Sequence, residues 1–388
     1  MTDSGIASAV DFSRESVRRS LPWACRRVQL VAWTNYWHSF RKYKNVHSLY
    51  CAGSYLQSVA DSTWEISPAI TTISSQALFL PGQLERVTGM AYTDNPRRDM
   101  TGGIETVQTA TRAFLLKNAL LIDGAVYKRR KRFDLYARSR HSRLRRYFPP
   151  SLVDYEVDRA AFYSSYEGNE FFGMWLTDDL PCYYLSKHFG LPVTTSHVAF
   201  PHSLQYERWL GIEPRRLTSA YLREAVLFDD SGNTVDKVAR ARAVRDAILA
   251  RVKRVPTPGV FILRRSSGVA RVLHNELAIA EHLQVHCGFR VVDPTTEDVP
   301  DIVAACAGAK MVVGVEGSHL LHGVAVLPEG GGLLTLQPPS RFSGVIKRTT
   351  DQHRQRYGFV VGVPEGDGFR IDIAELERTL DLFSASTR

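Results

Sequence analysis

An α/β fold with parallel sheets is predicted by two stretches of the chain. Residues 259–363 alternate β-type and α-type segments with short connections, as in a doubly wound, Rossmann-like sheet. Residues 168–235 show the same alternation over a shorter span. The chain has 388 residues, of which 44% are hydrophobic, which rules out disorder, collagen or a coiled coil for the whole chain. We therefore expect two α/β halves that form a two-domain sandwich around a cleft.

The first 50 residues are basic and aromatic, with Trp23, Trp33 and Trp37 among several arginines. This pattern indicates either a surface helix packed on the body or a peripheral contact with an anionic membrane. Residues 68–130 are predicted to be mainly strands in hairpins, including ALFLPG at 77–82. Asp123-Gly124, between LLI and AVY, is a strong hairpin-turn signal.

Between residues 171 and 254 we expect three helices and one strand. The helices are 171–189, ending at Gly190, 202–210, ending at Gly211, and 235–254, stopped by Pro256. The last helix makes a plausible domain junction. We therefore predict a basic aromatic segment at 1–70, an N-terminal α/β domain with hairpins at 71–235, and a C-terminal Rossmann-like domain at 236–388.

Within 259–363 the predicted strands and helices follow one another along the chain. The strands are GVFILRR, FRVVDP, KMVVGVEG, GLLTLQPP and YGFVVGV, and the helices are NELAIAEHLQVHCG, VPDIVAACAGA and SHLLHGVAVLP.

The net charge of +9 has a single local source. Residues 128–146 hold ten Lys/Arg and one Asp, so the rest of the chain is neutral overall. A general nucleic-acid binder is therefore not expected. The stretch suits contact with an anionic membrane or an anionic glycan. The alternative function is a non-catalytic binder of nucleic acid or an anionic surface, using Phe133, Tyr136 and Tyr147 within or beside the basic stretch.

The five cysteines are scattered and form no CxxC pair, which fits a reducing compartment and excludes a zinc ribbon. No apolar run is long enough to span a bilayer and no secretory signal is recognised. We expect a cytoplasmic protein, and the alternative is a protein attached peripherally at the inner face of the membrane.

Candidate ligand-binding residues follow three predicted strands, because ligands bind at the carboxyl ends of strands in open α/β sheets. These positions are Arg264-Arg265, Asp293-Pro294 and the glycine-rich turn at 314–319. Arginines and a glycine-rich turn before a helix suit a nucleotide diphosphate. The alternatives remain ordinary surface charge and a tight turn. His319 and His322 lie three residues apart and, with Glu316, suggest a metal site. Because a third well-placed ligand beside the two histidines is not visible, no metal is expected.

The order and spacing of these motifs resembles glycosyltransferase family 61. The similarity extends over about 110–365 and rests on Arg265, Arg271, Asn275-Glu276, Gly288-Phe289, the turn at 314–318, the LLTLQPP strand, and Gly168-Asn169 followed by WLTDDLP at 175–181. The segment after Gly168-Asn169 departs from the family pattern in two ways. Met174 replaces a histidine, and two residues are inserted after Gly-Asn. Glu316-Gly317 replaces the frequent His-Gly, which looks like a subfamily feature.

The resemblance implies a GT-B-like fold, with two Rossmann-like domains whose parallel sheets face each other across a cleft. It implies an inverting hexosyl- or pentosyltransferase that moves a sugar from a nucleotide-diphosphate sugar, expected to be a UDP-sugar, to a hydroxyl of a glycan or polysaccharide precursor. No cofactor would be required.

The same resemblance suggests roles for individual residues. Arg264, Arg265 and Arg271 would contact the diphosphate. The amides of Gly317 and Ser318 would bind the β-phosphate, and Glu316 would bond a hydroxyl of the ribose or sugar. The remaining candidates are Asn275 and Glu276, as helix caps or ligand contacts, His319 beside the turn, and Asp178 as the general base.

Overall fold

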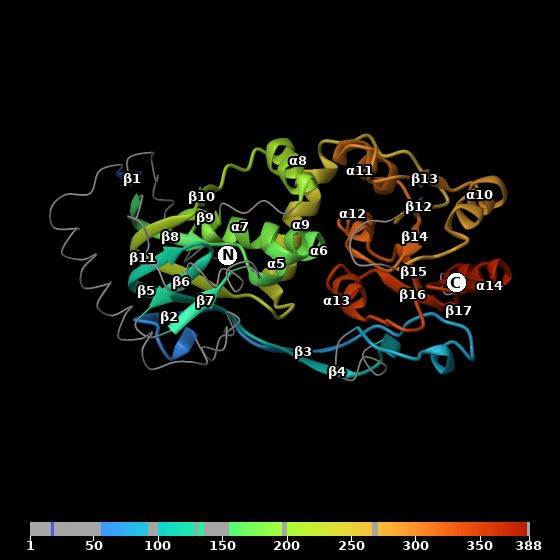
Figure 1. Cartoon of the computed structure of the whole chain (residues 1–388), viewed down its shortest axis with the longest axis horizontal. Helices are drawn as coiled ribbons and strands as arrows, with labels where there is room; N and C mark the ends of the chain where they lie inside the picture. The colour runs from blue at the N-terminus through green and yellow to red at the C-terminus, as the bar shows by residue number, and fades with distance from the viewer. Residues whose placement is uncertain are drawn as a thin grey trace, which may run out of the picture.

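The computed structural model describes residues 56–91, 100–128, 131–135, 155–195, 200–265 and 271–385, with the backbone of residues 17–18. Within these residues the chain forms a mixed α/β structure in two lobes (Figure 1), each built on a sheet that contains parallel strands. Most of residues 1–70 and of the basic stretch 128–146 lie outside the described residues, as do Tyr136 and Tyr147, so their expected roles stay predictions.

The N-terminal lobe contains a nine-stranded sheet whose main strands run in the order β10-β9-β8-β11-β5-β6-β7. From β10 to β11 the neighbours are parallel, and from β11 to β7 they are antiparallel. The short strands β1 and β2 pair with β8 and β5. The strand bounds are β1 Val17–Arg18, β2 Ser62–Ser67, β5 Thr111–Ile122, β6 Ala125–Lys128, β7 Lys131–Asp134, β8 Tyr155–Phe162, β9 Leu191–Thr195, β10 Arg215–Leu217 and β11 Ser219–Asp229.

The C-terminal lobe contains a five-stranded, fully parallel sheet in the order β13-β12-β14-β15-β16. Numbered along this lobe, that order is 2-1-3-4-5, one of the doubly wound arrangements. The doubly wound sheet predicted for residues 259–363 is therefore confirmed. The strand bounds are β12 Val260–Ile262, β13 Arg290–Val292, β14 Met311–Val315, β15 Gly332–Gln337 and β16 Arg356–Val361.

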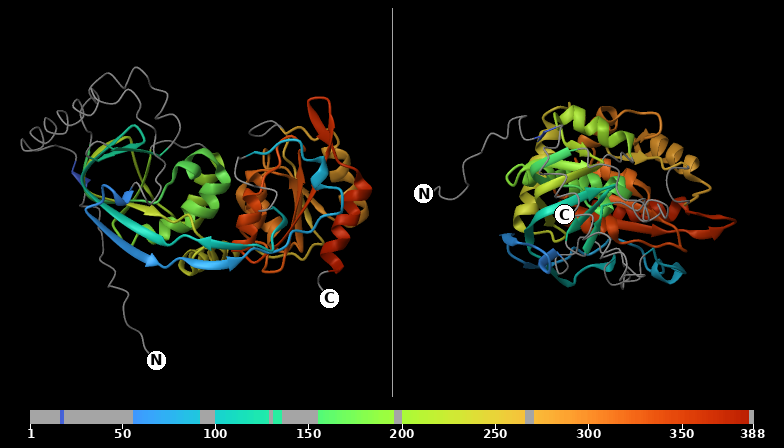
Figure 2. Two further views of the ribbon diagram at one scale, coloured as in Figure 1. Left: turned by 90° about the horizontal axis from the view of Figure 1, so that it is seen from below. Right: turned by 60° about the vertical axis from the view of Figure 1, so that its left-hand side comes forward.

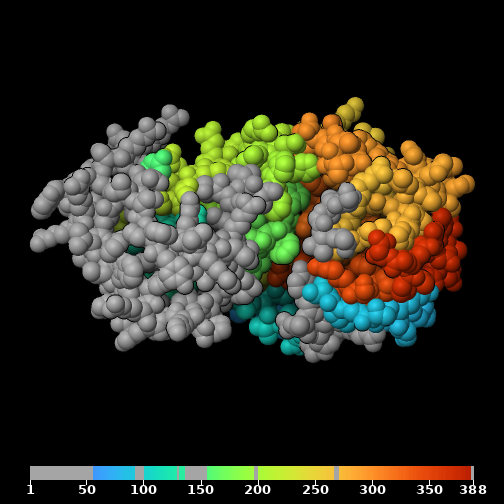
Figure 3. Space-filling model, in the orientation of Figure 1, coloured from blue at the N-terminus to red at the C-terminus, as the bar shows by residue number. Residues whose placement is uncertain are grey.

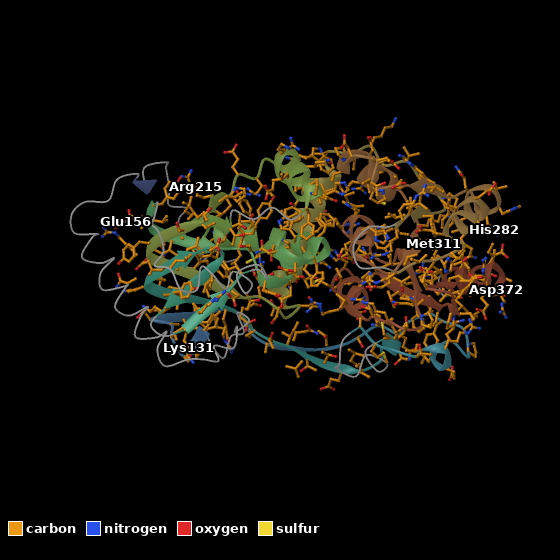
Figure 4. All side chains as sticks on the ribbon, viewed as in Figure 1. Lys131, Glu156, Arg215, His282, Met311 and Asp372 are labelled. Atoms are coloured by element: carbon orange, nitrogen blue, oxygen red, sulfur yellow. The ribbon has the colours of Figure 1, made fainter. Side chains whose placement is uncertain are left out.

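Helices cover both faces of the C-terminal sheet. Alternate strand residues pack against α11, α12 and α13 on the face turned to the N-terminal lobe, and against α10 and α14 on the other face. Figure 4 shows Met311 of β14 inside this lobe, with His282 and Asp372 toward its outer end. The helix bounds are α10 Glu276–Cys287, α11 Val299–Ala307, η4 Ser318–Leu320, α12 Leu321–Val324, α13 Val345–Gln352 and α14 Ile373–Ala385.

The two lobes share one continuous apolar core. Its members include Phe172 and Tyr206 of the N-terminal lobe together with Leu321 and Ile302 of the C-terminal lobe. The remaining helices are α5 Tyr166–Glu170, α6 Phe172–Met174, the π-helical segment η3 Trp175–Asp179, α7 Leu180–Ser186, α8 Pro201–Leu210 and α9 Val235–Leu249. Several of them lie between the two sheets (Figure 1).

A two-stranded ribbon of β3 Ile70–Ile73 and β4 Glu105–Gln108 leads from the N-terminal lobe to the C-terminal lobe (Figure 2, left). Beyond it, residues 77–91, here called the strap, lie against the C-terminal lobe and include the turn η2 Leu84–Arg86. Leu78 pairs with Gly358 of β16, and Met90 pairs with Phe342. The strap therefore belongs spatially to the C-terminal lobe, although the sequence analysis grouped it with residues 71–235.

Several local predictions can be compared with this structure. The Asp123-Gly124 turn between β5 and β6 is confirmed, and both residues have positive φ, 49° and 77°. Gly211 and Gly288 end α8 and α10 in the left-handed conformation, as expected. The strand expected at 77–82 is wrong, because these residues form only the single bridge at Leu78.

The helix expected across 318–328 is also wrong in length, since it consists of the single turn η4 and the four-residue α12. A hairpin of β17 Val363–Glu365 and β18 Gly368–Arg370 follows β16. No helix in the described ranges is long and apolar enough to cross a membrane.

Candidate active site

The candidate site begins where β12 and β14 end side by side in the C-terminal sheet. The strand order reverses between these two strands, and such switch points are where ligands bind in open α/β sheets. Arg264 follows β12, and Glu316-Gly317 follows β14. The structure thus brings together two predicted segments that lie about fifty residues apart along the chain.

Three arginines converge on Glu316. Arg264 and Arg271 both donate from Nη1 to the Glu316 backbone carbonyl, at 3.3 and 2.7 Å. Arg271 also forms an ion pair with the Glu316 carboxylate, at 3.0 Å, and Arg341 Nη1 lies 3.9 Å from the same oxygen. The Glu316 residue thus gathers three guanidinium groups at this end of the sheet, two at its carbonyl and two at its carboxylate, with Arg271 at both.

The positive charge of these arginines is partly withdrawn from water. Arg264 is only 5% exposed, and its burial together with the charge of Arg271 lowers its pKa to about 10. Burial and a neighbouring like charge both disfavour the charged form of Arg264. A bound anion favours that form, so this arrangement suits a diphosphate.

Gly317 is required by the closeness of these side chains. A Cβ at this position would lie 2.0 Å from Arg264 Nη1 and 3.1 Å from Arg271 Nη1. The next residue, Ser318, lies beside Gly173 of α6, whose Cβ would be 3.2 Å from Ser318 Oγ. The glycine-rich turn therefore contacts the arginines on one side and the N-terminal lobe on the other.

The other predicted residues of this edge have supporting positions. The Glu276 carboxylate accepts hydrogen bonds from the backbone N–H groups of Arg264 and Arg265, at 2.6 and 3.1 Å. The Asn275 side chain does not cap α10 but bonds both backbone groups of Ile371. Both residues therefore hold the chain around the turn.

Arg265 and His319 differ from Arg264 in their surroundings. Arg265 has a positive φ of 53°, and its side chain bonds Asp293 at 3.2 Å. His319 is buried, and burial together with the charges of Arg264 and Arg271 lowers its pKa well below the usual range. His319 is therefore a neutral imidazole at physiological pH.

Asp178 lies in the N-terminal lobe, within η3, as the sequence suggested for a helical carboxylate. It forms an ion pair with Lys237, which is 1% exposed, and lies 3.9 Å from Arg348 of α13. Burial opposes ionisation of Asp178, but the charges of Lys237 and Arg348 outweigh it and lower its pKa.

Glu167 is a second carboxylate in this region, and the sequence analysis missed it. It lies in the first turn of α5, which follows the carboxyl end of β8 beside the strand-order reversal between β8 and β11. Its side chain is exposed, yet partial removal from water and the charge of Asp178 raise its pKa. The sequence feature that could have identified Glu167 is its position directly before the Gly168-Asn169 pair.

Asp179 explains why Gly168 lies at that position. Its carboxylate accepts hydrogen bonds from the Ser165 N–H, at 3.0 and 3.1 Å, at the start of α5. A Cβ on Gly168 would lie 1.9 Å from this carboxylate. Asp179 therefore fixes α5, and with it Glu167, on the η3 segment.

A pocket of about 350 Å³ opens beside the three arginines. Its lining includes Arg271, Arg341 and Ser340, together with Val272 and with Met90 and Ala91 from the end of the strap. Its size falls within the range of small-molecule sites. Two of the three arginines thus face a space that a ligand can enter.

The described part of the chain holds no cluster of three or more His, Cys, Asp or Glu side chains arranged to bind a metal ion. His322 instead bonds Tyr206 and His202 of α8, at 2.9 and 3.1 Å, and links the two lobes. In the described part of the basic stretch, Lys128 pairs with Asp61 and Arg132 with Asp134.

Comparison with family models matches residues 172–334 to the family described as Glycosyltransferase 61. The match confirms the predicted resemblance, over a shorter stretch than the expected 110–365. It includes Asp178 and every predicted residue from Arg264 to His319, and it excludes Glu167, Arg341 and the strap. A search of curated proteins finds no match to this chain.

Proposed function

Since residues 172–334 match Glycosyltransferase 61, which indicates a glycosyltransferase, we propose that this protein transfers a sugar from a nucleotide-diphosphate sugar to a hydroxyl acceptor. The observation that carries the proposal is the convergence of three arginines on Glu316, with Arg264 and Arg271 at its backbone carbonyl and Arg271 and Arg341 at its carboxylate. Guanidinium groups recognise phosphate oxygens by paired hydrogen bonds, and a diphosphate is the leaving group of such donors.

The arginines would act on the bond that breaks. As the bond between the anomeric carbon and the diphosphate oxygen lengthens, negative charge grows on that oxygen. Groups that are already fixed and positively charged stabilise this state more than the ground state. Arg264 and Arg271 are held in place by the Glu316 carbonyl, and Arg264 is buried, so they need little reorganisation.

Transfer with inversion requires a base that takes the proton of the acceptor hydroxyl. The sequence suggested Asp178, whose lowered pKa and ion pair with Lys237 make it a weak base. Glu167 has a raised pKa and an exposed side chain in the same region, which makes it the stronger base of the two. We therefore propose that Glu167 accepts the proton and that the negative charge of Asp178 helps to raise the pKa of Glu167.

The wider proposal follows the resemblance. The arrangement would be GT-B-like, with the donor on the C-terminal lobe and the acceptor on the N-terminal lobe. The acceptor would be a glycan or polysaccharide precursor, and the reaction would take place in the cytoplasm or at the inner face of the membrane. The interlobe position of Ser318 beside Gly173 supports a reaction centre between the lobes.

Thermal and calorimetric binding measurements test this proposal with UDP, GDP, CMP, dTDP and the corresponding nucleotide sugars. A ligand at a hundred times its dissociation constant should stabilise the fold by about 2.7 kcal/mol. We expect stabilisation by one nucleotide class, lost in Arg271→Ala and Arg341→Ala. Arg290→Ala, whose exposed side chain pairs with Glu297, is the matched control and should bind normally. Absence of stabilisation by every nucleotide and sugar would contradict the proposal.

A further inference from the structure

The pocket beside the arginines has two chemically distinct parts. One part carries the guanidinium groups of Arg271 and Arg341, which reach toward Glu316. The other carries the apolar side chains of Met90 and Val272, which are 37% and 40% exposed. Large apolar side chains exposed on opposite segments of one pocket are available to cover an apolar or planar ligand surface.

Met90 comes from a part of the chain that is far away in sequence. It ends the strap, which is seen as a cyan band along the lower edge of the C-terminal lobe (Figure 3). The family match begins only at residue 172, so this wall of the pocket lies outside the matched region. Val272, by contrast, directly follows Arg271 within it.

The strap is fixed to the pocket rim by backbone hydrogen bonds. Thr88 and Gly89 donate to the Pro339 carbonyl, at 2.8 and 3.1 Å, and Phe342 donates to the Gly89 carbonyl at 3.0 Å. A Cβ on Gly89 would lie 2.4 Å from the Ser340 carbonyl oxygen, so only glycine allows this approach. Met90 is therefore presented by an ordered backbone, which reduces the entropic cost of binding against it.

Charge and volume together indicate what the pocket would hold. The arginine end suits phosphate oxygens, whereas Met90 and Val272, among the described residues of the lining, form an uncharged part. Asp367, which also lines the pocket, is highly exposed and lies 3.4 Å from His274. A ligand with an anionic end and an uncharged planar end matches these surfaces.

We infer that the pocket is the nucleoside subsite of the donor, with the base covered by Met90 of the strap and by Val272, and the diphosphate held at Arg271 and Arg341. The inference rests on the proposed function and assigns donor recognition to a segment outside the family match. The strap thereby becomes a specificity-determining part of the site.

Isothermal titration with two kinds of probe tests the inference. Inorganic pyrophosphate reports the arginine end alone, whereas UDP, GDP and dTDP report both ends. Met90→Ala and Val272→Ala should each weaken the preferred nucleotide about 2- to 3-fold, as expected for the loss of some 15–25 Å² of apolar cover, and leave pyrophosphate affinity unchanged. Val285→Ala, an exposed valine on α10 outside the pocket, is the matched control and should change neither affinity.

The outcomes separate the inference from its premise. Unchanged nucleotide affinity in both Met90→Ala and Val272→Ala would overturn the inference and leave the proposed function standing. Nucleotides that bind the wild-type protein no more tightly than pyrophosphate would overturn it as well. If neither nucleotides nor pyrophosphate bind the wild-type protein, the proposed function itself fails.

Discussion

Glu167 and Asp178 are two carboxylates in one region whose surroundings shift their pKa values in opposite directions. Partial burial and the charge of Asp178 raise the pKa of Glu167, whereas Lys237 and Arg348 overcome burial and lower that of Asp178. Separation of this kind is how active sites assign different roles to chemically similar groups. At the residue scale, these two side chains carry the catalytic part of the proposal.

Glu167→Gln should reduce kcat by about 10²- to 10⁴-fold, because a positioned base contributes about that much, while the affinity for the donor stays unchanged. A base must be ionised, so wild-type activity should fall as the pH drops through the raised pKa of Glu167. That acid limb should lie above the ordinary glutamate value of about 4.3 and should disappear in the variant. Steady-state kinetics across pH provide the measurement.

The stability of the same variant gives an independent check. A raised pKa means that ionised Glu167 is less favourable in the folded than in the unfolded chain, so its ionisation costs stability as the pH rises. Glu167→Gln should therefore be more stable than the wild type at neutral pH, while Glu170→Gln on the same helix serves as the control. An acid limb that survives in Glu167→Gln and is lost in Asp178→Asn would return the base to Asp178.

Element positions followed from the sequence far better than side-chain partnerships did. Strands and helices of the C-terminal sheet were predictable because apolar runs alternate with amphipathic segments and end at Gly288 or before prolines. The strap was not predictable, because residues 77–91 have no regular hydrogen-bonding pattern of their own. They are held by single bridges to residues more than 250 positions away.

In the candidate site, too, the positions of strands and helices were predictable and the partners of side chains were not. The carboxyl-end rule placed Arg264 and Glu316 correctly at one sheet edge, because it depends only on strand order. Arg341 follows β15 and Glu167 follows β8, so both also lie beyond carboxyl ends of strands, but the rule does not say which side chains meet there, because packing decides that. Likewise, Asn275 stands at a helix start, yet its side chain turns to Ile371, a partner that no local pattern indicates.

The contact between α6 and η4 supports a prediction at the element scale. A Cβ on Gly173 would lie 2.4 Å from Leu321 Cδ1 of α12, which follows η4 directly. Gly173→Ala should therefore lower the free energy of unfolding by about 1–3 kcal/mol, the usual cost of overpacking, as measured by urea denaturation. It should also weaken turnover, because η4 contains Ser318 of the glycine-rich turn.

A double-mutant cycle separates this clash from a general effect of alanine on α6. Leu321→Ala removes the atom that the new methyl group would meet. Gly173→Ala should then cost less in the Leu321→Ala background than in the wild type, which is a coupling of at least about 0.5 kcal/mol. Purely additive losses would show that the interlobe contact does not limit this position.

At the scale of the whole molecule, the strap connects the two lobes by a second route besides their shared core. The chain leaves the N-terminal lobe through β3, lies along the C-terminal lobe as the strap, and returns through β4. Arg86 fixes it there by a bidentate pair with Glu375 of α14, at 2.6 Å for both bonds, and by a bond to the Val361 carbonyl at 3.1 Å.

Arg86→Ala should lower the free energy of unfolding by about 1.5–3 kcal/mol at neutral pH, since hydrogen bonds between charged groups are worth that much. The hydrogen bond from Arg86 lowers the pKa of Glu375 in the folded protein. Its stabilising effect is therefore fully present above the unfolded pKa, and it is lost as the pH falls through the folded value. The difference between wild type and variant should shrink below about pH 4.

Urea denaturation at several pH values measures this difference, with Arg370→Ala as the matched control. Arg370 pairs with Glu365 at 2.9 Å, but both side chains are about half exposed, so its loss should cost less than about 1 kcal/mol. Equal losses in the two variants, or a loss from Arg86→Ala that does not change with pH, would contradict an anchoring role for this pair. Because Met90 lies only four residues beyond Arg86, an anchored strap also predicts that Arg86→Ala weakens nucleotide binding more than pyrophosphate binding.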